Sequence, residues 1–170
     1  MLSPAITKAL NEQLNKEFYS AYLYLSMANY YDDEGLNGFQ NWMEIQAQEE
    51  RSHAMLFREY LQQNDAEVIL AAIDAPDADF SSRIEPLEKT LEHERKVTAS
   101  IHAIYALAFD EKDFRTMQFL DWFVSEQREE EHNAQDIIKW FKLYGQDAKG
   151  LYDLDAKLAA RVFSPPGLVL

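Results

Sequence analysis

Four stretches of the chain with a helical apolar period each carry one glutamate inside the apolar stripe, namely Glu17, Glu50, Glu94 and Glu130. His53 follows Glu50 by three residues, so the two side chains share one face of a helix. A carboxylate on a core-facing stripe is costly unless a cation compensates its charge. Helical bundles build two-iron centres from acids on four helices and a Glu-x-x-His step. The residues therefore predict a buried metal centre where four helices meet.

Each of these residues also has an ordinary structural explanation. A single glutamate in an apolar stripe is more often paired or snorkelling than a metal ligand, and a single histidine is more often a hydrogen-bonded core residue. However, no Lys or Arg falls on the stripe positions near these acids. Clustered like charges raise one another's pKa or require a counter-cation. With one acid from each of four helices, we therefore favour metal binding.

A second acidic group accompanies the first. Glu126, Glu129 and Glu130 share one face of the fourth stretch, and Glu49 directly precedes Glu50. Carboxylate oxygen is the ligand that hard cations prefer. We call these four residues the second acidic group and predict that it could hold a further cation.

Four other side chains, one tyrosine and three histidines, lie outside these two sets. Tyr24 lies two helical turns after Glu17, a position that suits core packing or, equally, hydrogen bonding and one-electron donation beside metal ions. His93, His102 and His132 fall outside the apolar stripes and are predicted to lie on the solvated surface.

The predicted elements are helical throughout. We expect helices over residues 4–32, 38–64, from Ser82 to the break at 110–113, 113–144 and, shorter, 149–161. Ser82 and Glu85 have the spacing of a capping box. The inward stripe of the first helix is predicted as Leu14, Phe18, Ala21, Leu25 and Ala28.

The connections predict the topology. The first and third connections are short, whereas residues 65–81 form a long crossover. Short, long and short connections produce an up-down-down-up bundle. We thus predict an all-α fold, a four-helix bundle over about residues 4–144 with a short fifth C-terminal helix, in a single domain of residues 1–170.

Composition restricts the function. Asp and Glu number 30 against 16 Lys and Arg, for a formal net charge of −14, which disfavours nucleic acid and anionic membranes as partners. The chain has no cysteine, which excludes disulfides, zinc–thiolate sites, iron–sulfur clusters and thiol nucleophiles. No secretory signal or membrane-length apolar run is evident, so we predict a cytoplasmic protein without a membrane partner.

Three segments carry a family resemblance: NEQLNKEFYSAYLYL, AQEERSHA and WFVSEQREEE are similar to those of prokaryotic non-haem ferritins, and the likeness covers essentially the whole chain. It implies a ferritin-like bundle that stores iron. Fe(II) would be oxidised by O2 or H2O2 at a dinuclear ferroxidase centre and deposited as a ferric oxide mineral inside a hollow homo-oligomer of 24 subunits.

The resemblance also implies roles for individual residues. One metal ion would be held by Glu17, Glu50 and His53, and the other by Glu50, Glu94 and Glu130, with Glu50 as the bridge. Gln127 matches a glutamine beside the second metal, and Tyr24 matches a tyrosine near the centre. Glu49, Glu126, Glu129 and Glu130 match the third iron site of bacterial-type ferritins.

The chain departs from related families at three positions. Asn133 stands where bacterioferritins and rubrerythrins have a second Glu-x-x-His histidine, so no haem is expected. Met117 and Leu120 replace the two acids that line the three-fold pores of animal-type ferritins, so we do not transfer that route for iron.

Three other functions compete with iron storage. A discrete di-iron oxidase or peroxidase would use the same centre in a small oligomer. A mini-ferritin that shields DNA would build its site between subunits and often carry basic tails, unlike this acidic chain. A purely structural acidic bundle would bind no stoichiometric Fe(II).

Overall fold

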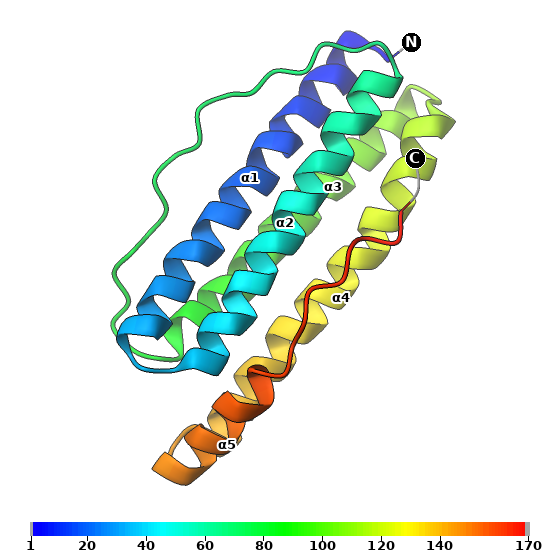
Figure 1. Ribbon diagram of the computed structural model, residues 1–170. Coiled ribbons are helices and arrows are strands. Elements are labelled where there is room, and N and C mark those ends of the chain that lie inside the picture. The colour runs from blue at the N-terminus through cyan, green and yellow to red at the C-terminus, as the bar shows by residue number, and fades with distance from the viewer. Residues whose placement is uncertain (1, 169–170) are drawn as a thin grey trace.

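The computed structural model describes residues 2–168, which form five helices and no strand. The helices are α1 (Pro4–Asp33), α2 (Asn37–Gln63), α3 (Glu85–Asp110), α4 (Phe114–Tyr144) and α5 (Ala148–Leu158). Figure 1 shows α1 to α4 as long rods packed side by side, with α5 at one end. No helix within the described residues is long and apolar enough to cross a membrane.

The helix boundaries follow local chemistry. Ser3 caps α1, since its Oγ accepts a hydrogen bond from the Ile6 N–H at 3.1 Å, and Asp113 caps α4 in the same way through the Thr116 N–H at 3.1 Å. The predicted capping box of Ser82 is wrong. Instead, the N–H and hydroxyl of Ser81 donate to the Glu85 carboxylate at 2.5 and 2.6 Å.

The long connection between α2 and α3 runs along the outside of α1 (Figure 1). It is held there mainly by side chains of α1. The Asn11 amide donates to the Glu67 carbonyl at 2.9 Å and accepts from the Ile69 N–H at 2.7 Å. At the other end of α1 the Tyr31 hydroxyl donates to the Arg83 carbonyl at 2.7 Å. These bonds order a crossover that has no helix or strand of its own, and they place α3 parallel to α2.

The short helix α5 docks on the first turn of α2. The Asp155 carboxylate accepts hydrogen bonds from the N–H groups of Gly38 and Phe39 at 2.8 and 3.0 Å. Residue 38 must be glycine here, because a Cβ atom would lie 1.7 Å from the Asp155 carbonyl oxygen. The helix ends at Leu158, three residues before the predicted end, and the Asn41 amide donates to the Leu158 carbonyl at 3.3 Å.

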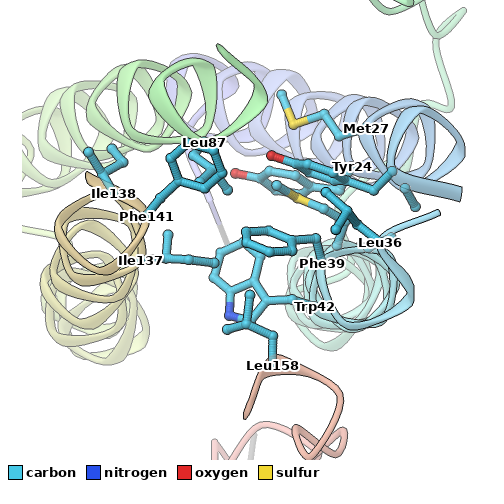
Figure 2. Close-up of a cluster of buried hydrophobic side chains, with 14 of the residues drawn as sticks. Tyr24, Met27, Leu36, Phe39, Trp42, Leu87, Ile137, Ile138, Phe141 and Leu158 are labelled. Atoms are coloured by element: carbon cyan, nitrogen blue, oxygen red, sulfur yellow. The ribbon is translucent and has the colours of Figure 1, made fainter. Parts of the chain in front are cut away.

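Two apolar clusters fill the bundle. The first, shown in Figure 2, joins α1, α2 and α4 to α5 through residues such as Met27, Phe39, Phe141 and Leu158. The second fills the other end of the bundle and includes Leu10, Leu14, Phe57, Leu61, Ile101 and Phe123. Along every long helix the predicted ligands lie between the two clusters, so a buried polar layer separates two apolar regions.

The predicted inward stripe of α1 is partly wrong. Leu14 is fully buried, but Leu25 is 44% exposed. The stripe continues instead through Tyr24 and Tyr31, one position to the side, and both are fully buried. Their phenol groups are accommodated because each hydroxyl has a hydrogen-bond acceptor inside the fold.

Candidate metal centre

The four helices bring five potential ligands into the buried polar layer. Glu17 comes from α1, Glu50 and His53 from α2, Glu94 from α3 and Glu130 from α4, and none is more than 4% exposed. One ligand atom each of Glu17, Glu50 and His53 lies within 4.8 Å of the others. Because these atoms come from different turns and helices, the site exists only when the bundle is folded.

Two carboxylate oxygens in this layer have no hydrogen-bond partner. They are Oε2 of Glu17 and Oε1 of Glu50, both inaccessible to solvent. A buried polar atom without a partner costs about 1–3 kcal/mol, and more if it is charged. The amide oxygen Oε1 of Gln46 is unpaired in the same way. A metal ion that accepts oxygen ligands would satisfy these atoms, so the donor set fits iron.

Burial dominates the electrostatics of the carboxylates. It raises the pKa of Glu17 above the ordinary value, and it raises the pKa of Glu94 to about 7. Burial, reinforced by the charge of Glu94, raises the pKa of both Glu50 and Glu130 well above the ordinary value. The metal-free layer therefore retains protons near neutral pH, and a bound cation must replace them.

His53 is prepared for metal binding by its surroundings. Its ring packs edge-on against Trp122 and Phe123, and its Nδ1 lies 3.6 Å from Oε2 of Glu50. Burial lowers the pKa of His53 to about 4, so the imidazole is neutral at pH 7 and has a lone pair available for a metal ion.

Side-chain donors hold the carboxylates of α3 and α4 in place. The Gln127 amide donates to Oε2 of Glu94 at 3.0 Å, and the Tyr24 hydroxyl donates to Oε1 of the same residue. The Gln46 amide donates to Oε2 of Glu130 at 2.8 Å. These contacts orient both acids before any ion binds. Hydrogen bonds of this kind fix metal ligands in other proteins.

The sequence did not indicate two orienting residues, Gln46 and Gln13. The buried Gln13 amide donates to Oε1 of Glu17 at 2.7 Å, and its own oxygen accepts from the Ser100 hydroxyl at 2.6 Å. Lys16 donates in turn to Ser100 at 2.7 Å. The available signal was the spacing of four residues between Gln13 and Glu17, which places an amide on the same helix face as a buried acid.

The prediction that His93 lies on the solvated surface is wrong. Its Nε2 lies 2.7 Å from the Ser20 hydroxyl, and its ring packs against Tyr19 and the edge of Tyr24. Burial lowers its pKa to about 4. His93 lies at the margin of the α3 stripe, and two tyrosines of another helix, α1, cover its ring. The sequence of α3 alone does not indicate this contact. The other two histidines, His102 and His132, are exposed as predicted.

The second acidic group lies at the edge of the buried layer, and one of its four carboxylates is already paired with an arginine side chain of the same subunit. Oε1 of Glu126 lies 4.0 Å from Nε2 of His53, and burial raises the pKa of Glu126 to about 7, with the charges of Glu129 and Glu49 adding to the shift. Glu129 is exposed. Glu49 forms an ion pair of 2.5 Å with Arg161, a residue that the sequence did not connect to this group.

Four long helices, one long crossover and a buried Glu-x-x-His set define a helical-bundle metalloprotein with an acidic centre. Comparison with known proteins makes the assignment more specific. The ferritin family, described as a ferritin-like domain, matches residues 7–143. The chain belongs to the ferritin family, and it is an iron-storage ferritin, a family with ferroxidase activity.

Its relatives are similar over nearly the whole chain. A bacterial non-heme ferritin of Staphylococcus epidermidis is 40% identical over 164 residues, covering 96% of this chain and 99% of the relative. A probable bacterial non-heme ferritin-like protein of Haemophilus influenzae is 37% identical and covers 93% and 96%.

Solved structures agree with the fold. An open-pore ferritin from Archaeoglobus fulgidus superimposes with a TM-score of 0.93 at 44% identity, covering 95% of this chain and 100% of the archaeal one. A version of that ferritin engineered into a closed form has a TM-score of 0.94 at 45% identity, covering 96% and 100%. These likenesses confirm the predicted fold class and the resemblance to prokaryotic non-haem ferritins.

Proposed function

We propose that this ferritin oxidises Fe(II) at a dinuclear centre formed by Glu17, Glu50, His53, Glu94 and Glu130. The observation that supports this most directly is the convergence of Glu17, Glu50 and His53 within 4.8 Å, with two carboxylate oxygens left unpaired. Oxidised iron would leave for the interior of a hollow shell of 24 copies and form a ferric oxide mineral there.

The ligands divide between two iron ions. One Fe(II) would bind Glu17, Glu50 and neutral His53, and the other would bind Glu50, Glu94 and Glu130. Each ion loses one electron. The two electrons and two protons convert O2 to H2O2, or H2O2 to two molecules of water. Anionic oxygen ligands stabilise the added positive charge of Fe(III), and the paired sites hold both electrons within reach of one oxidant.

The neighbouring residues have supporting roles in this proposal. Gln127 and Tyr24 orient Glu94, and Gln46 orients Glu130, through the hydrogen bonds described above. The two-electron step takes both electrons from iron, so Tyr24 acts in it by orienting Glu94. The buried, neutral phenol lies one hydrogen bond from a proposed ligand of the second ion.

The remaining features are proposals that rest on the sequence. Residues 1–170 form one domain of a cytoplasmic protein in this proposal, and iron is its metal. We expect no haem, since Asn133 replaces the second histidine. The excess of acidic residues argues against nucleic acid and anionic membranes as partners.

Gel filtration followed by aerobic loading with Fe(II) tests this function. We expect a large hollow particle that takes up far more iron than its protein ligands can bind and develops the absorbance of a ferric mineral. A small oligomer that binds only a few iron ions and turns over an organic substrate would instead identify a discrete di-iron oxidase. Absence of stoichiometric Fe(II) binding would leave a structural bundle.

Glu129→Ala is expected to change the ratio of iron oxidised to O2 consumed more than it changes the initial rate. Glu129 belongs to the second acidic group and is exposed, whereas the residues of the dinuclear centre are buried. An oxygen electrode combined with stopped-flow absorbance measures both quantities. Glu59→Ala, which removes an exposed acid elsewhere on α2, is the matched control. An unchanged ratio in Glu129→Ala would argue against a third iron site.

A further inference from the structure

Arg161 lies in the tail after α5, yet its side chain reaches α2. Its Nη2 donates to Oε2 of Glu49 at 2.5 Å, and its Nη1 donates to the Trp42 carbonyl at 3.2 Å. The guanidinium carbon also lies 4.7 Å from the centre of the Trp42 ring. A charged hydrogen bond, a backbone acceptor and an aromatic face together hold the guanidinium in one orientation.

The backbone near Arg161 is fixed as well. The Asn41 amide donates to the carbonyl of Arg161 at 3.1 Å and to that of Leu158 at 3.3 Å. Two turn hydrogen bonds, from Ala160 to the Lys157 carbonyl and from Arg161 to the Leu158 carbonyl, close the segment. The docking of α5 through Asp155 thus continues into a short anchored segment, which we call the arginine segment (residues 159–161).

The guanidinium lies against a group that would otherwise be purely acidic. Glu49 is close enough to Glu129 and Glu130 for their charges to repel, and Glu126 is repelled by Glu49 and Glu129. The ion pair is shielded, since the side chains of Arg161 and Glu49 are 21% and 19% exposed. A pair of this kind is screened less than one in open solvent.

We propose that Arg161 is the built-in counter-cation of the second acidic group and that an iron ion must displace it to bind Glu49. This inference rests on the proposed function, because it concerns the third position on the iron path. The guanidinium carries a permanent positive charge and donates to Oε2 of Glu49, so a metal ion at this carboxylate is repelled by it and competes with it for the same group. Arg161 thereby determines how tightly the third position binds iron.

Two consequences follow from this competition. The third position binds iron more weakly than its four carboxylates would allow, which favours onward movement of iron over retention. In addition, occupation of Glu49 by metal releases the Arg161 side chain, so the arginine segment loses one of its attachments to α2. A purely structural ion pair, which only fastens the tail, produces neither effect.

Calorimetric titration with Zn2+ tests the competition without redox chemistry. We expect wild-type protein to bind two equivalents tightly and a third more weakly. In Arg161→Gln the third equivalent is expected to bind about tenfold more tightly, the effect of removing one charge-assisted hydrogen bond that competes for the ligand, while the first two are unchanged. Arg161→Lys keeps the charge but loses the planar fork, and is expected to fall between the two.

The matched control is Lys157→Gln. Lys157 belongs to the same part of the chain and carries the same charge, but it lies over the Trp140 ring at 3.6 Å. We expect this variant to bind the third equivalent as wild type does. Adding Glu49→Gln to Arg161→Gln should remove the gain in affinity, which would locate the effect at this carboxylate.

Hydrogen exchange on the wild-type protein supplies a second measurement that requires no variant. Saturation of the third equivalent should speed exchange at the amides of Ala160 and Arg161. Equal third-site affinity in wild type and Arg161→Gln, or exchange that Zn2+ leaves unchanged, would overturn the inference. Absence of a third equivalent from every variant would overturn it too, whereas loss of the two tight equivalents would contradict the dinuclear centre itself.

Discussion

Replacing Glu50 by alanine is expected to abolish the rapid oxidation of Fe(II) while the protein still assembles. Glu50 is the proposed bridge between the two iron ions, and its buried Oε1 has no other partner. Loss of a residue that merely orients a metal ligand costs about 10–100-fold in affinity or activity, so loss of the bridge should cost more than about 100-fold. The initial rate of Fe(II) oxidation in stopped flow measures this.

Two further variants make the result specific. His53→Ala should lose the fast phase as well, because the imidazole is the nitrogen ligand beside Glu50. Glu44→Ala removes an exposed acid from the same helix and should oxidise iron at the wild-type rate. Gel filtration of all three variants verifies assembly. Wild-type rates in Glu50→Ala would exclude the dinuclear centre as the place of oxidation.

Saturating Zn2+ is expected to stabilise the protein by about 4 kcal/mol when the free ion is at a thousand times its Kd. This stabilisation should be present at pH 7.5 and largely lost at pH 5.5. Metal ions compete with protons for carboxylate ligands. The pKa of Glu94 is about 7 and that of Glu50 is raised well above the ordinary value, so both carry protons at the lower pH.

The metal-free protein should show the opposite dependence on pH. The folded-state pKa of Glu94 is about 7 against 4.5 ordinarily, so its contribution to stability is complete below pH 4.5 and is lost as the pH rises through 7. His53 acts the other way. Its folded-state pKa of about 4 lies below 6.5, so its contribution is present above pH 6.5 and is lost as the pH falls through 4. Several carboxyl groups with a raised pKa therefore oppose one imidazole with a lowered pKa, and the net stability of the metal-free protein should fall as the pH rises.

Unfolding in guanidinium chloride, with and without Zn2+ at pH 5.5, 6.5 and 7.5, measures both dependences of stability on pH. Calorimetry in two buffers with different ionisation enthalpies counts the protons that each Zn2+ releases. Glu50→Gln, which keeps the side-chain volume and removes the charge, is the control and should lose most of the response to Zn2+. A stabilisation that does not change with pH, or binding without proton release, would contradict the protonation of the buried layer.

The four helices and the five buried ligand candidates could be predicted because their signals are local. A glutamate inside an apolar stripe is visible within a few turns of helix, and Glu50 with His53 within one. Leu25 was misplaced because two neighbouring registers of α1 both have apolar residues, and the choice was made by hydroxyl acceptors on other elements. His93 was misplaced for a related reason, since Tyr19 and Tyr24 of α1 cover it.

Arg161 could not have been connected to Glu49 by any pattern in the chain. The arginine segment reaches α2 because Asp155 docks α5 on the first turn of α2, and because the Asn41 amide of α2 donates to the carbonyl of Arg161. These contacts depend on the end-to-end packing of α5 on the bundle. A charged residue in a proline-rich tail has no periodicity of its own, so the sequence alone favours solvent exposure.

The buried layer draws its ligands from the middle of α1 to the middle of α4, in a chain that has no cysteine. Ions bound there would act as reversible crosslinks, since they join helices that lie far apart along the chain. Closing such long loops in the unfolded chain is what makes crosslinks stabilising. The subunit would therefore be fastened while iron is bound and would loosen as the ferric product departs.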